Sequence, residues 1–222
     1  MEPGNVKLNY YDYSWPLSPS NCPCDLHFTQ YVESRRIEGK VIFHFGPGIH
    51  HIVGKHNFQR GNPNEIIAIT ASYEETTSRS GEHDAYIDFI VDNPAAANCY
   101  KVLFADIYTL SPRLLPSFDI VTLFHLCEYY DEQYFDGRKF NRLNSSYARL
   151  DDAGLLEMFL SKLNIGGKIF FFTKSGGFIH GDRRAAKIVD DYVSQRKLVI
   201  EDEYETLLIC GRPVNENCCR SK

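Results

Sequence analysis

A glycine-proline-glycine corner is the first part of this sequence whose residue types point to ligand chemistry. Gly46, Pro47 and Gly48 follow an apolar run in the segment GKVIFHFGPGIHHIVG, Gly39–Gly54. The glycines carry no side chain and permit positive φ, so a ligand can approach the backbone closely. A helix that begins after Gly48 would present unpaired N–H groups to a polar or anionic ligand. The corner predicts either a cofactor site or a tight turn, and the glycines alone do not decide between them.

Histidine and cysteine are the other chemically active residues, and their spacing does not predict a metal site. His50, His51 and His56 do not follow the i, i+4 spacing that places two ligands on one helical face. The seven cysteines are an odd number, which does not indicate a disulfide framework. Their close pairs, 22/24 and 218/219, are tighter than the spacing of roughly two to four residues usual in zinc sites. We therefore expect free thiols and no metal.

Alternating strand and helix patterns must position the corner. Seven segments have the apolar pattern of strands: 40–45, 65–70, 101–107, 118–126, 168–174, 197–204 and 205–213. Helical patterns cover 26–37, 49–59, 82–93, 151–164 and 182–196. This alternation predicts a parallel sheet covered on both faces, and the last two strands have almost no linker, which predicts an antiparallel hairpin. Ligands of such sheets bind beyond the carboxyl ends of the strands, where the corner falls.

Composition excludes several classes of protein. The 222 residues carry a formal net charge of −5, whereas nucleic-acid-binding domains usually have a basic face, so we do not expect nucleic acid as a partner. No apolar run approaches the roughly 20 residues of a membrane-spanning helix. The N-terminus lacks a basic region followed by an apolar stretch, so we expect no secretory signal and a cytoplasmic location.

The chain divides into an arm, a domain and a tail. Residues 1–25 are rich in Tyr, Pro, Ser and Asn and predict an extended arm, which either packs its aromatic residues on the surface or covers a pocket. Residues 26–214 form the expected domain, with an insertion at 129–150, and 215–222 form a flexible tail. The insertion interleaves basic and aromatic residues, which suits either a solvated cover or a nucleic-acid contact, and the acidic net charge favours the cover.

The order of the motifs resembles that of the class I S-adenosylmethionine-dependent methyltransferases. Gly46 and Gly48 match the glycine-rich loop after strand one, and Asp106 matches the aspartate after strand three. An FD pair precedes strand four, a GG turn precedes strand five, and a hairpin closes the domain. The resemblance covers roughly 39–213. It implies a Rossmann-like, three-layer α/β sandwich whose mostly parallel, seven-stranded sheet ends in a C-terminal antiparallel hairpin.

The resemblance also implies S-adenosylmethionine as the cofactor. The residues that would contact it are His44, Gly46, Pro47, Gly48, Thr70, Ser72, Asp106 and Ile107. Asp106 would accept a hydrogen bond from the adenine amine, and Ile107 would contact the ring. His44 and Thr70 depart from the family pattern because both positions are acidic there. The lost grip on the ribose hydroxyls would cost about 1.5–3 kcal/mol unless Ser72, Glu74 or Glu75 compensates.

Methyl transfer to a small-molecule acceptor is the activity that the resemblance implies. The catalytic candidates are His125, Glu128 and Tyr129, with His125 as a general base. Alternatively, His125 only pairs with backbone at a strand end. The arm and the insertion would wall the acceptor site. Two other functions stay open: a non-catalytic protein with a degenerate cofactor site that binds a protein partner, and an RNA methyltransferase that uses the basic insertion. A nicotinamide enzyme ranks below these, because the third glycine of its motif is replaced by His51.

Overall fold

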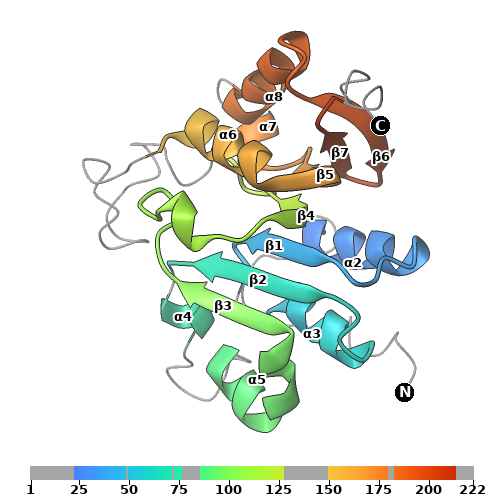
Figure 1. Cartoon of the computed structure of the whole chain (residues 1–222), viewed down its shortest axis with the longest axis vertical. Coiled ribbons are helices and arrows are strands. Elements are labelled where there is room, and N and C mark those ends of the chain that lie inside the picture. Colours follow the sequence, from blue (N-terminus) through green and yellow to red (C-terminus); the bar gives the residue numbers. More distant parts are fainter. Residues whose placement is uncertain are drawn as a thin grey trace, which may run out of the picture.

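One mixed sheet runs through the protein. Its strands are β1 Val41–Phe45, β2 Glu65–Thr70, β3 Tyr100–Phe104, β4 Phe118–Thr122, β5 Leu163–Phe172, β6 Val199–Tyr204 and β7 Leu207–Gly211. Their order across the sheet is β3-β2-β1-β4-β5-β7-β6 (Figure 1). The structure is a computed structural model that describes residues 23–48, 50–71, 73–76, 86–127, 150–179 and 183–213.

The strand directions change only at the C-terminal end of the chain. β1 pairs in parallel with both β2 and β4, β2 pairs in parallel with β3, and β4 pairs in parallel with β5. β7 is antiparallel to both β5 and β6, so the hairpin is inserted with its second strand next to β5. The first parallel strand, β1, therefore lies at the centre, where the strand order reverses and a ligand site is expected.

Helices cover both faces of the sheet. They are α2 Cys24–Ser34, α3 Ile52–Gln59, α4 Tyr73–Thr76, α5 Tyr86–Asp92, α6 Asp152–Lys162, α7 Gly176–Ile179 and α8 Arg184–Ser194, with short 3-10 helices η1 Pro94–Asn98 and η2 Pro112–Leu114. Successive residues of β1 point to opposite faces. Ile42 joins a core with Phe28 of α2 and Val53 of α3, whereas Phe43 joins a core with Phe159 of α6. These two cores make the molecule a three-layer sandwich.

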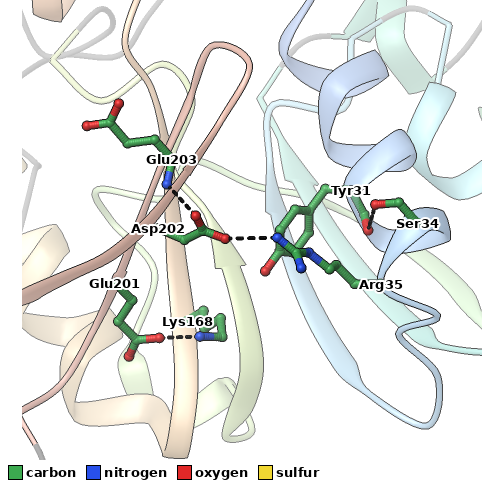
Figure 2. Close-up of polar contacts among 7 residues, drawn as sticks. All are labelled: Tyr31, Ser34, Arg35, Lys168, Glu201, Asp202 and Glu203. Atoms are coloured by element: carbon green, nitrogen blue, oxygen red, sulfur yellow. Dashed lines mark hydrogen bonds and ion pairs between the residues drawn. The ribbon is translucent and has the colours of Figure 1, made fainter.

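Contacts between α2 and the C-terminal hairpin hold the two ends of the described chain together. Figure 2 shows Arg35, the residue that follows α2, donating a hydrogen bond to Asp202 of β6, with 3.3 Å between Nη2 and Oδ2. Both side chains are largely exposed, so this ion pair contributes little to stability. The Tyr31 ring packs edge-on against Phe170 and Tyr204, with centroid distances of 5.1 and 5.4 Å. Tyr31 and Phe170 are buried, so this aromatic packing contributes more to stability than the exposed ion pair.

The predicted fold class is confirmed, and the element boundaries differ in a few places. All seven predicted strands and all five predicted helices are present. The predicted strand 118–126 is too long, because β4 ends at Thr122 and the buried residues after it form a turn. The predicted helix 151–164 ends at Lys162, and β5 begins at the next residue without a loop. α2 begins at Cys24, inside the expected arm; residues 1–22, the tail 215–222 and all of the insertion before Leu150 lie outside the described residues.

Candidate cofactor site

The glycine corner forms the floor of the site at the end of β1. Gly46 and Gly48 have φ values of +72° and +66°, a conformation that side chains with a Cβ rarely adopt. The Gly46 amide donates a hydrogen bond to the Ile69 carbonyl at 3.1 Å, which ties the corner to β2. α3 begins at Ile52 rather than directly after Gly48, because His51 adopts the left-handed conformation and delays the helix. Both glycines are therefore required by backbone conformation.

A pocket opens above the corner, at the carboxyl ends of β1, β2 and β3. Its lining residues are Phe45, Gly46, Ile69, Thr70, Ala71, Glu75, Ala105, Asp106, Ile107 and Tyr108. Four of the residues expected to contact the cofactor are among them: Gly46, Thr70, Asp106 and Ile107. Pro47 and Gly48 do not line this pocket, and Ser72 lies outside the described residues.

Glu75 supplies the carboxylate that the end of β2 lacks. It lies on α4, and its side chain lines the pocket beside Thr70. The Thr70 hydroxyl donates a hydrogen bond to this carboxylate. Glu75 Oε2 is buried and has no hydrogen-bond partner among the described residues. Burial raises the pKa of Glu75, and the Thr70 hydroxyl and nearby His125 oppose that shift. Because a buried polar atom without a partner is unfavourable, a ligand hydroxyl that donated to Oε2 would satisfy it.

Asp106 faces the pocket from the turn that follows β3. Its Oδ1 accepts a hydrogen bond from the Tyr108 amide at 2.9 Å, which fixes the orientation of the carboxylate. Partial burial raises the pKa of Asp106, and the Tyr108 amide opposes that shift. Ile107 and the Tyr108 ring are buried beside it. The turn thus offers one carboxylate next to apolar surface, an environment that suits a flat ring with an amino group.

His44 does not reach the pocket, although its motif position suggested a cofactor contact. The ring is fully buried within β1, with Nδ1 2.7 Å from Thr122 Oγ1. Nε2 lies 3.6 Å from Asp25 Oδ1. Burial, with smaller contributions from nearby His125 and His51, lowers the pKa of His44 to about 3. The approach to Asp25 is therefore not an ion pair at neutral pH, and the His44 ring lies within the sheet and does not line this pocket.

His125 lies on the ligand side of the sheet, as its sequence position predicted. It follows β4 in the turn 124–127, and a Cβ placed on Gly46 would lie 4.0 Å from its Cδ2 atom. Its ring packs edge-on to Phe172 at the end of β5, with 6.5 Å between the centroids. His125 thus borders the glycine corner on the side away from β2. Glu128 and Tyr129, the other two catalytic candidates, lie outside the described residues.

Two polar pocket residues, Glu75 and Tyr108, were not among the expected cofactor contacts. Glu75 was one of three possible substitutes for the missing acid, and no sequence signal pointed to Tyr108. Tyr108 does more than line the pocket, because its hydroxyl donates to Asp152 Oδ1 of α6 at 2.8 Å. The same oxygen accepts from the Cys127 amide at 3.1 Å. Asp152 therefore links the pocket wall to the turn that carries His125.

Neither a protein-family model nor a curated protein sequence matches this chain. Many solved structures resemble it, among them the following three. A caffeoyl-CoA O-methyltransferase candidate from Staphylococcus aureus has a TM-score of 0.54 at 10% identity, covering 96% of this chain and 93% of that one. The chain has the class I methyltransferase fold. The SAH-bound methyltransferase PaMTH1 of Podospora anserina has a TM-score of 0.51 at 11% identity, covering 96% and 88%. A Geobacter sulfurreducens SAM-dependent methyltransferase in complex with S-adenosyl-L-homocysteine also scores 0.51 at 11% identity, covering 90% and 72%.

Metal and membrane features complete the description of this methyltransferase fold. Within the described ranges, no three His, Cys, Asp or Glu side chains gather as a metal ion requires. The cysteines in these ranges form no disulfide with one another; they are Cys24, Cys99, Cys127 and Cys210. Of the helices in the described part of the chain, none has the length and apolar character needed to cross a membrane.

Proposed function

We propose that this protein is an S-adenosylmethionine-dependent methyltransferase that acts on a small-molecule acceptor. The observation that carries the proposal is the pair of carboxylates in one pocket at the switch point of the sheet. Glu75 has a buried oxygen without a partner, and Asp106 lies at the end of the neighbouring strand. Ribose hydroxyls would donate to Glu75 and the adenine amine to Asp106, while Gly46 and Gly48 would border the amino-acid portion.

The cofactor supplies an activated methyl group on a sulfonium, and the protein has to hold the acceptor in line with it. Holding the reacting atoms together provides most of such an acceleration. His125 lies next to Gly46, at the carboxyl end of β4, and would therefore be close to the bound cofactor. Its imidazole is suited to accept the proton that an oxygen or nitrogen nucleophile loses, a contribution of about 10²–10⁴-fold in rate.

The two other functions weighed from the sequence have less support. A degenerate cofactor site was suggested by the missing acid at Thr70, but Glu75 places a carboxylate beside that position. An RNA substrate would call for a basic surface, whereas the chain carries a net charge of −5. A small-molecule acceptor agrees with both observations.

Calorimetric titration with S-adenosylhomocysteine (SAH) tests the proposal, with Glu75→Gln as the main variant. This change removes a charged acceptor and is expected to weaken SAH binding by about 10- to 150-fold, the equivalent of about 1.5–3 kcal/mol. Glu203→Gln is the matched control, because Glu203 is an exposed glutamate on β6, at the opposite edge of the sheet from β3. The control is expected to bind SAH as tightly as the wild type.

Absence of SAH binding by the wild type at millimolar concentration would refute the proposal. Equal binding by the wild type and Glu75→Gln would refute the role of the carboxylate. If SAH binds, RNA and small-molecule acceptors are separated by salt, because RNA binding weakens steeply as ionic strength rises. Transfer to small molecules that persists at high salt is the expected result.

A further inference from the structure

His51 is a fully buried histidine whose two ring nitrogens are both hydrogen-bonded. Nε2 lies 2.5 Å from the backbone carbonyl oxygen of Glu75, and Nδ1 lies 2.6 Å from the Tyr100 hydroxyl. A carbonyl oxygen only accepts, so Nε2 carries the ring proton and donates a hydrogen bond to the Glu75 carbonyl. In the neutral ring Nδ1 then accepts from Tyr100. The ring therefore joins α4, which carries Glu75, to the first residue of β3.

Tyr100 is a rigid anchor for this histidine. It is fully buried, and burial raises the pKa of its hydroxyl well above the ordinary value, so it remains a donor. A Cβ on Gly54 of α3 would lie 2.2 Å from the Tyr100 ring, which shows how closely the helix packs on it. The Tyr86 hydroxyl donates to the Tyr100 carbonyl at 3.1 Å, and its ring packs edge-on to Tyr100. Tyr100 of β3 is thus held by α3 and α5, and its hydroxyl in turn orients the His51 ring.

The hydrogen bond from His51 acts on the residue that faces the cofactor pocket. Glu75 is held through its carboxylate by Thr70 and through its main chain by His51. α4 is only four residues long, so its own hydrogen bonds provide little rigidity. We propose that His51 is a positioning residue, which sets the place of the Glu75 carboxylate and thereby the recognition of ribose hydroxyls. This inference rests on the proposed function.

His51 is expected to affect ribose recognition and not adenine recognition. Asp106 is oriented by the Tyr108 amide, within the turn that follows β3, whereas Glu75 is oriented from α4 and by His51. The informative quantity is therefore the ribose ratio, defined as the Kd of 2′,3′-dideoxy SAH divided by the Kd of SAH. Loss of the Glu75 alignment lowers this ratio, whereas general damage to the pocket weakens both ligands alike.

Two variants of His51 separate its two hydrogen bonds. His51→Asn places an oxygen near the Nδ1 position, tolerates the left-handed backbone, and cannot reach the Glu75 carbonyl. His51→Gln carries an amide N–H long enough to reach that carbonyl. We expect the ribose ratio to fall by about 5-fold in His51→Asn, the worth of one hydrogen bond, and to be largely retained in His51→Gln. Thermal unfolding of both variants reports whether they fold.

Tyr100→Phe is a third variant, which keeps the buried ring and removes only the hydroxyl that orients His51. It is expected to lower the ribose ratio by a smaller factor than His51→Asn does. It keeps the inference testable if the His51 variants do not fold. Asp106→Asn is the control, with weaker binding of both ligands and an unchanged ratio.

A ribose ratio in His51→Asn and Tyr100→Phe equal to that of the wild type would overturn the inference and leave the proposed function intact. So would an equal fall in the ratio for His51→Asn and His51→Gln. A wild-type protein that binds neither ligand would overturn the proposed function, and the inference with it.

Discussion

Acidification to about pH 5 is expected to destabilise this protein through one buried side chain, His44. Its burial, with a smaller contribution from His125 and His51, lowers the pKa of the folded imidazole from 6.5 to about 3. The unfolded chain regains the ordinary value. Between these two pKa values the unfolded state binds a proton that the folded state does not, so stability falls as the pH falls.

The size of this effect follows from the unfolded chain. At about pH 5 the protonated form of the unfolded imidazole outnumbers the neutral form by roughly 30 to 1. This favours unfolding by about 2 kcal/mol relative to about pH 8. The folded ring hardly titrates in this range, so the figure is nearly independent of the folded pKa. Above about pH 6.5, the unfolded pKa, this contribution to stability is fully present. Below that pH it is lost progressively, until the pH reaches the folded pKa of about 3.

Urea unfolding at about pH 8 and about pH 5, for the wild type and His44→Asn, measures the effect. Asparagine keeps a side chain that can hydrogen-bond to Thr122 and does not titrate. Other groups titrate in both proteins and cancel in the difference. The wild type is expected to lose about 2 kcal/mol more than the variant. Equal losses would refute the reasoning and indicate that the folded ring accepts a proton and pairs with Asp25, 3.6 Å from Nε2.

Two further predictions concern packing and buried hydrogen bonds. Gly54→Ala is expected to cost about 1–3 kcal/mol in urea unfolding, because its Cβ overlaps the buried Tyr100 ring; a gain of about 1 kcal/mol, as at an open helical glycine, would contradict this. Asp152→Ala leaves the Tyr108 hydroxyl and the Cys127 amide without their acceptor and is expected to cost about 1–3 kcal/mol. Asp152→Asn keeps an acceptor oxygen and is expected to cost less; equal losses would contradict the role of the hydrogen bonds.

Much of the fold could be predicted because its strands are apolar runs bounded by breakers. β1 and β2 lie within one residue of the predicted ends for that reason. The start of α3 could not be predicted, since nothing in its residue type announces that His51 adopts a positive φ. The predicted end of β4 was too late, because Leu123, Phe124 and Leu126 continue the apolar pattern of a strand although they are buried outside it. Apolar patterns report burial, and burial does not require regular structure.

The candidate site was predictable where it follows strand ends. Gly46, Thr70 and Asp106 line one pocket because each lies at the carboxyl end of a parallel strand, and these ends converge. The choice of Glu75 among its polar neighbours depends on the turn of α4, which its sequence does not specify. The His51–Tyr100 hydrogen bond joins residues 49 positions apart, and no local pattern predicts such a pair.

The lining of the candidate cofactor pocket has a consequence for the protein during synthesis. All of its residues come from one continuous stretch, 45–108, whereas the hydrogen bond from the Val41 amide to Asp119 spans 78 positions. Shorter loops close at lower entropic cost, so β1, β2 and β3 are expected to pair while β4 is still emerging from the ribosome. During that interval β1 is an open edge with unpaired backbone groups, although it becomes a central strand. The arrival of β4 both closes this edge and brings His125 to a pocket already formed.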